Sequence, residues 1–275
     1  MTIRQTLQRA ANWYGRHARL RADPRRIAVA IPTYNRADRV LAAVPELLRD
    51  PRVAEIVVRD DASDNQDGEA LAEGLKPFAP RVRLFRNEAN LGAFANKLAV
   101  VADCRSRWAV LLDSDNRLGA DYLDSFFALP AWSERVIYCP QRARPRFDFT
   151  WLAGVALDEG AMPDVFTLER NESMCVFLNT GNYLVPVQPY VRSLEPYADR
   201  RVAAADVWFA NMIWLHAGGL LYVVPGMEYD HDVHDGSWFK TTAATSKPLA
   251  REMRDALASG DTERVAALLA TIGRP

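Results

Sequence analysis

An alternation of strand-like and helix-like segments begins at residue 27 and constrains the fold more than any other feature of the sequence. Four short apolar runs are typical of buried strands, and three segments with helical periodicity separate them. The apolar runs are 27–31, 53–60, 81–87 and 107–113, and the helical segments are 37–50, 68–79 and 92–104. Such alternation builds a mostly parallel sheet that helices cover on both faces. The sequence therefore predicts an α/β fold.

Polar clusters follow all four predicted strands, at the point where each strand ends. They are PTYNR at 32–36, DDASD at 60–64, NEANLG at 87–92 and DSDN at 113–116. Ligands of open parallel sheets bind at the carboxyl ends of the strands. One turn rich in Asp, Ser and Asn is ordinary, but four in succession on the same edge outline a binding cleft.

Two carboxylates, Asp113 and Asp115, come directly after the buried run 108–112. A carboxylate at the end of an apolar strand is costly to desolvate unless a cation or a cationic ligand pairs with it. Asp and Ser are equally common in turns and helix caps, so these two acids alone leave both interpretations open. An EF-hand is excluded, because Arg117 and Leu118 stand where that loop needs an oxygen ligand and a glycine.

The composition is that of an ordinary globular protein. With 275 residues, 49% of them hydrophobic and 25% charged, the chain can bury the core of one large domain, or of one domain plus an appendage. The formal net charge of −1 argues against bulk nucleic-acid binding. Cys104, Cys139 and Cys175 lack the short spacings of zinc sites, which favours reduced structural thiols.

The N-terminal segment is locally basic. Residues 1–26 carry seven arginines against one aspartate, and apolar residues at helical spacing over 3–21 predict a basic amphipathic helix. Docking of this helix on the domain is favoured, and contact with an anionic membrane surface stays open. The sequence has no apolar run of the roughly 18 residues that a membrane span needs, and no signal peptide. We therefore expect a cytoplasmic protein, with peripheral contact with the inner face of the membrane as the open alternative.

The pattern after residue 130 is less regular. Segments 136–149, 173–187 and 219–239 combine strands and loops. Residues 204–219 are a clear helix that ends at Gly218, and the tail from 246 to 273 predicts two short helices.

The four polar motifs, in this order, resemble the donor-binding half of the family 2 glycosyltransferases, which are inverting enzymes with the GT-A fold. The matching stretches are IPTYNR at 31–36, VVRDDASDN at 57–65, NLGAFANK at 90–97 and LLDSDN at 111–116. The second half is similar too. NTGNYLVPV at 179–187 resembles the acceptor-side strand of the family, and AAADVWFANMIWLHAGG at 203–219 resembles its Glu-Asp helix.

The resemblance covers residues 27–240 and implies a GT-A type α/β fold. A single Rossmann-like nucleotide-binding half at 27–130, with a mostly parallel sheet, would be fused to a smaller mixed-sheet acceptor-binding half at 131–240. A basic helix at 1–26 and a helical tail at 241–275 would flank this domain. The implied activity is transfer of one sugar from a nucleotide-diphosphate sugar, a UDP-sugar being favoured, to a hydroxyl of a carbohydrate or lipid-linked acceptor in surface polysaccharide or glycoconjugate synthesis.

The resemblance also assigns residues to the donor. The donor-binding set is Pro32, Thr33, Tyr34, Asn35, Arg36, Asp61, Asn90, Lys97, Asp113 and Ser114. Tyr34 and Asp61 would hold a uracil-like base, Lys97 would lie near the phosphates, and Asp113 would face the ribose or the sugar. The alternatives are a turn tyrosine, a helix N-cap for Asp61 and an exposed helix lysine for Lys97.

A divalent metal is implied as cofactor, because departure of a nucleoside diphosphate builds negative charge that a metal neutralises. Carboxylate oxygens suit Mg²⁺ or Mn²⁺. By resemblance Asp115 would hold the metal, with His234, favoured over His231, as a second ligand. Solvated loop histidines stay the alternative, and His17 and His216 are assigned to packing or surface.

Asp206 is the candidate catalytic residue, as the general base that an inverting transfer needs. It stands where the family has the second acid of its Glu-Asp pair, but Ala205 replaces the glutamate, which puts acceptor positioning in doubt. The alternative is that Asp206 is only the N-cap of a helix over 207–217.

Three rival functions differ in their sequence signals. A nucleotidyltransferase would open with a glycine-rich loop, which AIPTYNR at 30–36 lacks. A catalytically silent module that keeps the fold is favoured only by Ala205. A dinucleotide-dependent oxidoreductase is excluded, because no G-x-G-x-x-G follows the first strand. The membrane-embedded processive enzymes of the family carry a Gln-x-x-Arg-Trp box, and its absence favours single-sugar transfer.

Overall fold

The computed structural model describes residues 26–145, 147–168, 178, 181–202, 205–232 and 238–274, and for 238–243 it describes only the backbone. The helix predicted at 3–21, Cys175 and His234 lie outside the described residues.

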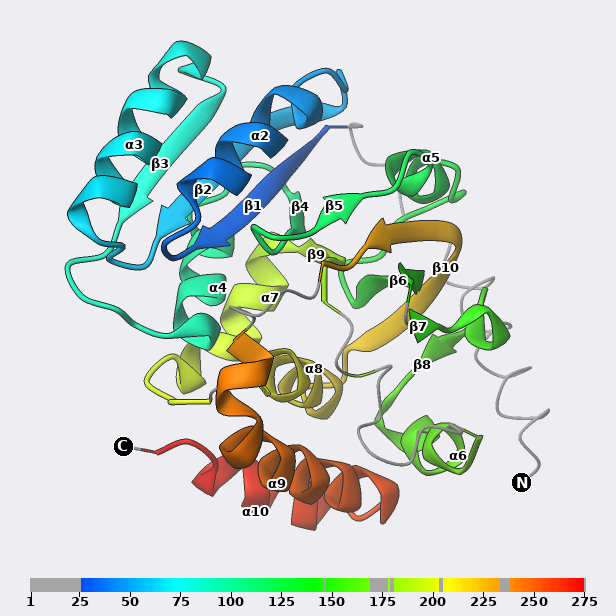
Figure 1. Ribbon diagram of the computed structural model, residues 1–275. Helices are drawn as coiled ribbons and strands as arrows, with labels where there is room; N and C mark the ends of the chain where they lie inside the picture. Colours follow the sequence, from blue (N-terminus) through cyan, green and yellow to red (C-terminus); the bar gives the residue numbers. More distant parts are fainter. Residues whose placement is uncertain are drawn as a thin grey trace.

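The described residues form one mixed sheet of ten strands, in the order β3-β2-β1-β4-β9-β6-β10-β5, with β7 beside β6 and β8 beside β10 (Figure 1). The strands are β1 Ile27–Thr33, β2 Val53–Asp60, β3 Val82–Arg86, β4 Trp108–Leu111, β5 Arg117–Leu118, β6 Val136–Arg144, β7 Phe147–Asp148, β8 Ala156–Leu157, β9 Leu184–Pro186 and β10 Leu220–Asp230. From β3 to β4 all neighbours are parallel. Strand β9 is antiparallel to both β4 and β6, and β10 pairs parallel to β6. The predicted α/β fold, with a parallel half and a mixed half, is confirmed.

Helices cover both faces of this sheet. They are α2 Ala37–Leu47, α3 Asn65–Leu75, α4 Ala93–Ala102, α5 Tyr122–Phe127, α6 Met162–Leu168, α7 Val187–Leu194, α8 Asp206–His216, α9 Trp238–Ala258 and α10 Thr262–Thr271. Short 3-10 turns lie at Lys76–Phe78, Thr150–Leu152, Glu159–Ala161 and Glu195–Tyr197. The prediction of two short C-terminal helices was wrong in length, because α9 begins at Trp238 and continues past Pro248.

The alternation of side chains along β1 divides the interior into two cores. Ile27, Val29 and Ile31 are buried on the face that α2 and α3 cover, whereas Ala28 and Ala30 are buried on the face that α4 covers. Successive side chains of a strand point to opposite faces, so one strand serves both cores. Because alanine side chains are small, α4 packs close to β1 and brings its polar residues to the end of the strand.

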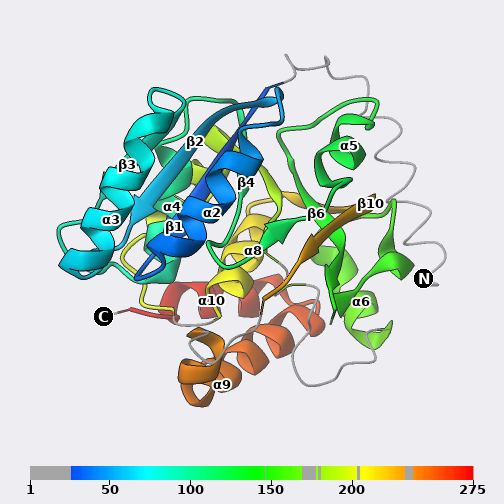
Figure 2. The same cartoon turned by 45° about the horizontal axis from the view of Figure 1, so that its top comes forward.

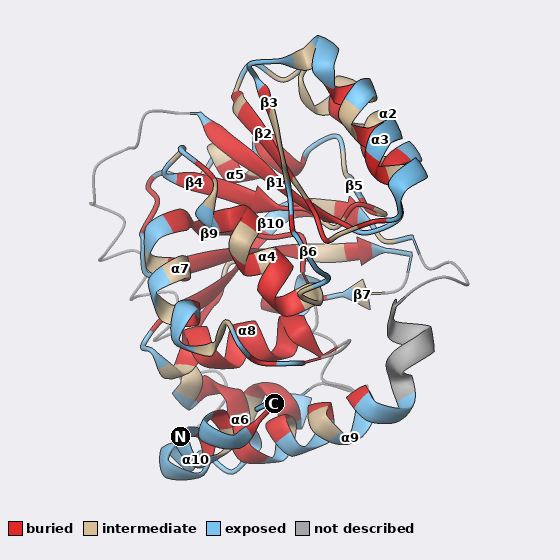
Figure 3. Ribbon diagram, turned by 90° about the vertical axis from the view of Figure 1, so that its left-hand side faces the viewer, coloured by how far each residue is buried: buried red, intermediate tan, exposed pale blue. Residues whose placement is uncertain are grey.

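Helix α8 is buried on every side. Every residue from Asp206 to Leu215 is buried, as Figure 3 shows for the body of this helix. It lies between α4 and α7 on one side and α9 and α10 on the other. Figure 2 shows α9 and α10 on the side of the molecule away from α2 and α3. A helix that is apolar around its whole circumference is typical of a central core position, and the acid at its start is enclosed with it.

The predicted polar clusters meet at one edge of the sheet. The register pairs Thr33 of β1 with Asp60 of β2, and Asp60 with Arg86 of β3. Strand β4 ends beside β1, with Leu111 opposite Ala30. Because these strands are parallel, the segments that follow them leave the sheet at the same edge.

Candidate functional site

Lys97 of α4 joins two carboxylates that come from different parts of the chain. Its Nζ lies 2.9 Å from Asp113 Oδ1, in the loop after β4, and 2.8 Å from Asp206 Oδ2, at the first residue of α8. The side chains of Lys97 and Asp206 are 15% and 7% exposed. Burial by itself would lower the pKa of Lys97, but the charges of Asp113 and Asp206 outweigh burial and raise it above its ordinary value. Lys97 is therefore a cation at neutral pH, and the alternative of an exposed helix lysine is wrong.

The start of α8 places Asp206 toward this lysine. Ala205 occupies the N-cap position, and its side chain makes no cap hydrogen bond. The alternative that Asp206 is the N-cap is therefore wrong: it is the first helical residue, and its carboxylate pairs with Lys97 instead. The positive end of the helix dipole and the ammonium of Lys97 both attract the negative charge of this buried carboxylate.

Asn182 fixes the loop that carries Asp113. Its Oδ1 accepts a hydrogen bond of 2.7 Å from the backbone N–H of Asp113, and its carbonyl accepts one of 2.5 Å from the hydroxyl of Tyr122. The backbone of Asn182 has a φ of 53°, in the left-handed region that Asn tolerates better than most residues. Asn182 therefore links the start of β9 to the loop after β4.

Asp115 faces a cation from the neighbouring strand end. Arg36 Nη1 lies 2.7 Å from Asp115 Oδ2, and the two side chains are 24% and 13% exposed. One turn further along α2, Arg39 Nη1 lies 2.5 Å from Asp232 Oδ2. The backbone N–H of Asp232 in turn donates to Asn116 Oδ1 at 3.1 Å. Two ion pairs and one hydrogen bond thus connect the start of α2, the loop after β4 and the segment after β10.

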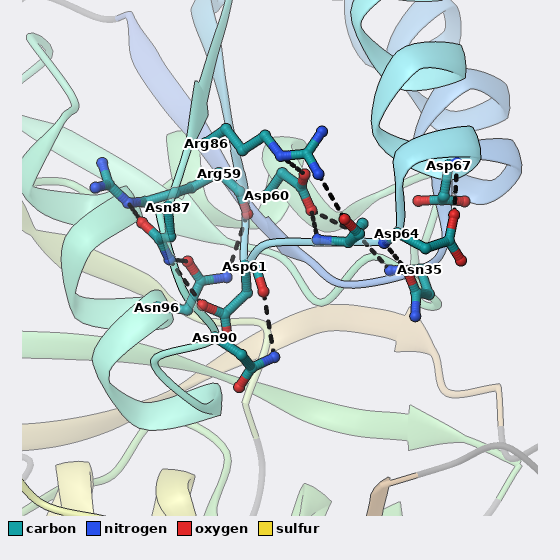
Figure 4. Close-up of polar contacts among 11 residues, drawn as sticks. Asn35, Arg59, Asp60, Asp61, Asp64, Asp67, Arg86, Asn87, Asn90 and Asn96 are labelled. Carbon is teal, nitrogen blue, oxygen red and sulfur yellow. Dashed lines mark hydrogen bonds and ion pairs between the residues drawn. The ribbon is translucent and has the colours of Figure 1, made fainter.

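Asp61 anchors the turn that leads into α4 (Figure 4). Its Oδ1 accepts hydrogen bonds from the backbone N–H of Leu91 at 2.8 Å and from Asn87 Nδ2 at 2.7 Å, and its Oδ2 accepts one from the N–H of Gly92 at 3.0 Å. Gly92 has a φ of +85°, which favours glycine there. A carboxylate offers about four acceptor positions, so three donors leave room for a fourth.

The loops after β1 and β2 are tied by Asn35. Its backbone N–H donates to Ser63 Oγ at 2.7 Å, and its Oδ1 accepts from the N–H of Asp64 at 2.9 Å. Asp64, not Asp61, caps α3, because its carboxylate accepts from the N–H of Asp67. The alternative of a cap for α3 at Asp61 is therefore wrong. The adjacent Tyr34 is 48% exposed, so its ring is open to solvent beside these loops.

A comparison of the sequence with models of known families identifies the family of this chain. A sequence model of the family described as glycosyl transferase family 2 matches residues 28–170. The chain belongs to glycosyl transferase family 2. The matched region contains β1 to β4 and the polar ends of these strands.

Two relatives of this family 2 chain are named as succinoglycan biosynthesis proteins. The chain is 33% identical over 223 residues to the succinoglycan biosynthesis protein ExoO of Rhizobium meliloti (strain 1021), covering 77% of this chain and 62% of that protein. It is 29% identical over 111 residues to the succinoglycan biosynthesis protein ExoU of the same organism, covering 40% of this chain and 32% of that protein. The chain therefore spans less than two thirds of the length of these relatives.

Solved structures of glycosyltransferases share the fold of the family 2 chain. GalNAc-T7 with UDP, GalNAc and Mn²⁺ matches with a TM-score of 0.60 at 16% identity, over 86% of this chain and 48% of that one. The mannosyltransferase PcManGT from Pyrobaculum calidifontis, in complex with GDP-Man and Mn²⁺, matches with a TM-score of 0.61 at 16% identity, over 97% and 76%. S. aureus TarS with UDP-GlcNAc matches with a TM-score of 0.59 at 13% identity, over 89% and 70%. At such identities the likeness concerns the fold alone, and it confirms the GT-A type.

The histidines of the family 2 chain have distinct environments. The ring of His231 lies 5.6 Å from the ring of Phe147 and 6.0 Å from that of Tyr229, between centroids. His216 Nδ1 lies 3.2 Å from Glu159 Oε1, in keeping with the packing or surface role predicted for it. His234, the predicted second metal ligand, lies outside the described residues.

The residues that could hold a metal are few in the part of the chain that is described. No group of three or more His, Cys, Asp or Glu side chains comes together there as a metal site. Asp115, the predicted metal ligand, has the guanidinium of Arg36 beside one of its carboxylate oxygens. Its hard oxygen donors suit Mg²⁺ or Mn²⁺.

The sequence predicted most of the polar residues at this edge, but several residues that make contacts there were not predicted. The buried Asn87 and Asn96 form a network with the half-buried Arg59, in which Asn87 Nδ2 also donates to Asn96 Oδ1 at 3.0 Å (Figure 4). Asn182 and Arg39 were missed as well. The signal for Asn182 was the Gly-Asn pair at 181–182 before an apolar run, a common turn sequence.

Cys104 and Cys139 are buried free thiols, as predicted. Burial raises the pKa of both thiols above the ordinary value. None of the helices in the described part of the chain is long and apolar enough to span a membrane.

Proposed function

We propose that the chain is an inverting glycosyltransferase that transfers one sugar from a nucleotide-diphosphate sugar, a UDP-sugar, to a hydroxyl of a carbohydrate or lipid-linked acceptor. The observation that carries this proposal is the pairing of Asp113 and Asp206 with one lysine. It brings an acid from the acceptor-side helix α8 to the loop at which the donor is expected. The names of ExoO and ExoU support a role in surface polysaccharide synthesis.

The nucleotide would bind where the loops after β1 and β2 meet. The exposed ring of Tyr34 offers a face for the base, and Asp61 retains an acceptor position for a ring N–H. The hydroxyl of Thr33 is buried and has no hydrogen-bond partner among the described residues. A bound nucleotide would supply such a partner, which offsets the cost of an unsatisfied buried group.

Asp206 would act as the general base. As the acceptor oxygen attacks the anomeric carbon, its proton passes to a carboxylate oxygen of Asp206, and the bond from the anomeric carbon to the diphosphate oxygen breaks. The electron pair of that bond leaves with the nucleoside diphosphate. Because attack and departure occur on opposite faces, one such displacement inverts the configuration.

Asp115 would hold a divalent metal, Mn²⁺ or Mg²⁺, with His234 as the proposed second ligand. When bound, the metal would neutralise charge on the departing diphosphate. The loops that follow the strands at this edge also contain four residues that the resemblance assigns to the donor: Asn35, Arg36, Asn90 and Ser114. Arg36 is placed to contribute positive charge there whether it faces Asp115 or a phosphate.

A panel of nucleoside diphosphates tests this proposal. UDP, GDP, ADP, CDP and dTDP are compared by thermal shift, each with and without Mn²⁺. We expect specific stabilisation by UDP that Mn²⁺ increases. Release of UDP from UDP-glucose, UDP-galactose or UDP-N-acetylglucosamine then distinguishes an enzyme from a silent module. Stabilisation by none of the diphosphates would refute a donor site, and binding of UDP without any turnover would support the silent module.

A further inference from the structure

The ion pairs of Lys97 connect the two halves of the domain at a single nitrogen atom. Asp113 belongs to the donor-side loop after β4, Asp206 to the acceptor-side helix α8, and Lys97 to α4 between them. Helix α4 packs against β1 and β2 as well as against α7 and α8. The lysine therefore stands on an element that is fixed to both halves.

The charges of this cluster do not cancel. One ammonium faces two carboxylates, and both carboxylates lie within 3 Å of the same nitrogen. Without the lysine, two like charges would remain close together in a largely buried place, where they repel each other. Asp206 would then lose the ion pair that joins its side chain to α4.

The surroundings restrict Lys97 to this position. Asn96, the residue before it, is buried and donates to the carbonyl of Arg59 at 3.2 Å, which fixes this turn of α4 to β2. Tyr190 of α7 is also buried nearby: burial raises its pKa to about 12, although its hydrogen bond with Tyr183 and the charge of Lys97 lower it. A lysine side chain is otherwise flexible, so this enclosure makes its ion pairs well defined.

We propose that Lys97 is a positioning residue for the transfer reaction, which holds the Asp206 carboxylate in place relative to the donor acid Asp113. This inference rests on the proposed function, because it assigns Lys97 a role through the candidate base. It differs from the phosphate contact expected from the sequence. A lysine that binds phosphate acts on donor affinity, whereas a lysine that positions the base acts on the chemical step.

Lys97→Met and Lys97→Arg separate these roles. The turnover number is measured as UDP release from the UDP-sugar that the wild-type chain consumes, UDP affinity by calorimetry, and folding by thermal unfolding. We expect Lys97→Met to lower the turnover number on the order of 10²-fold, with UDP affinity within about threefold of the wild type. Lys97→Arg, which keeps the charge, should retain more turnover than Lys97→Met.

A double-mutant cycle with Asp206→Asn shows whether the lysine acts through that residue. If it does, Lys97→Met should cost little further turnover in the Asp206→Asn background, because the group it positions is already removed. Fully additive losses would overturn the inference, as would unchanged turnover in Lys97→Met. A loss of UDP affinity as large as the loss of turnover would also overturn it, in favour of a phosphate contact.

Two further outcomes have defined meanings. If Lys97→Met does not fold, Lys97→Gln and Lys97→Arg are compared in its place, and equal turnover of these two variants would overturn the inference. If the wild-type chain consumes no UDP-sugar, the proposed function itself fails, and the inference fails with it. Wild-type turnover together with a fully active Lys97→Met variant refutes the inference alone.

Discussion

Arg36 Nη1 lies 2.7 Å from Asp115 Oδ2, so the acid that is proposed to hold a metal already has a cation beside it. The two cations would share one carboxylate, either at the same oxygen or at neighbouring ones. Electrostatic repulsion between them should then weaken the metal site in the absence of nucleotide. The affinity of the proposed metal site should therefore depend on Arg36.

Arg36→Gln should therefore tighten the binding of Mn²⁺ to the nucleotide-free protein, by roughly tenfold, or about 1.4 kcal/mol. The same change should weaken UDP binding in the absence of metal, because it removes a positive charge from the donor edge. Mn²⁺ binding is measured by electron paramagnetic resonance and UDP binding by calorimetry. Arg39→Gln is the matched comparison: Arg39 pairs with Asp232 one turn away and feels the charge of Asp115 only as a smaller contribution, so its loss should change Mn²⁺ affinity less than Arg36→Gln does. Unchanged Mn²⁺ affinity in Arg36→Gln would mean that the metal does not use Asp115.

Asp61→Ala should weaken UDP binding by about 1 to 3 kcal/mol, because a buried partner for a ring N–H is lost. It should also lower the free energy of unfolding, because the amides of Leu91 and Gly92 and the side chain of Asn87 lose their acceptor. Asp64→Ala is the matched control: it removes the N-cap of α3, at about 1 kcal/mol, and should leave UDP affinity unchanged. Equal UDP affinity in wild type and Asp61→Ala, measured by calorimetry, would place the base elsewhere.

Asp206→Asn should slow sugar transfer by roughly 10² to 10⁴-fold while UDP binding persists, because the amide cannot accept the proton. The structure sharpens this test, since Ala205 and not Asp206 occupies the N-cap position of α8. UDP release and UDP affinity are measured side by side. Turnover close to that of the wild type would dismiss Asp206 as the base and make Asp230 and Asp232 the next candidates.

Glu55 should make stability depend on pH at the acid end. Burial alone would raise the pKa of Glu55, but the Arg83 side chain and the backbone amides of Ser106 and Arg105 outweigh it and hold the pKa below its ordinary value of 4.5. A carboxyl whose pKa is lower in the folded state stabilises the fold above the unfolded-state pKa, and this contribution is lost as the pH falls through the folded-state pKa.

Glu55→Gln should consequently reduce the free energy of unfolding at pH 7 by about 1.5 to 3 kcal/mol, the range for hydrogen bonds to a charged group. The difference from the wild type should shrink below pH 4.5, where the unfolded chain is protonated at this position. Urea unfolding at pH 7 and at acid pH measures both values. A difference that stays constant with pH would show that the charge of Glu55 contributes nothing to stability.

The sequence alone determined the parallel half of the fold. Strand β2 matches the predicted range 53–60 at both ends, and the other three predicted strands differ by one or two residues at an end. These elements depend on the apolar pattern and the turn residues of a few consecutive positions, which the sequence displays directly. Three helices after β4, namely α5, α6 and α7, were missed. Helix α5 has six residues, and a helix this short depends on tertiary packing more than on its own propensity.

Only the tertiary structure decided how the polar residues pair. A lysine on a helix is exposed unless another element covers it, and the element that covers Lys97 is α8, which begins at Asp206 in the other half of the chain. Asp61 is likewise of a residue type common at helix caps, yet its carboxylate accepts hydrogen bonds from the amides of Leu91 and Gly92 in the next loop. The local sequence determines where each strand ends, because backbone preferences act over a few consecutive residues. Their partners are determined by the packing of elements far apart in the chain, which no local pattern records.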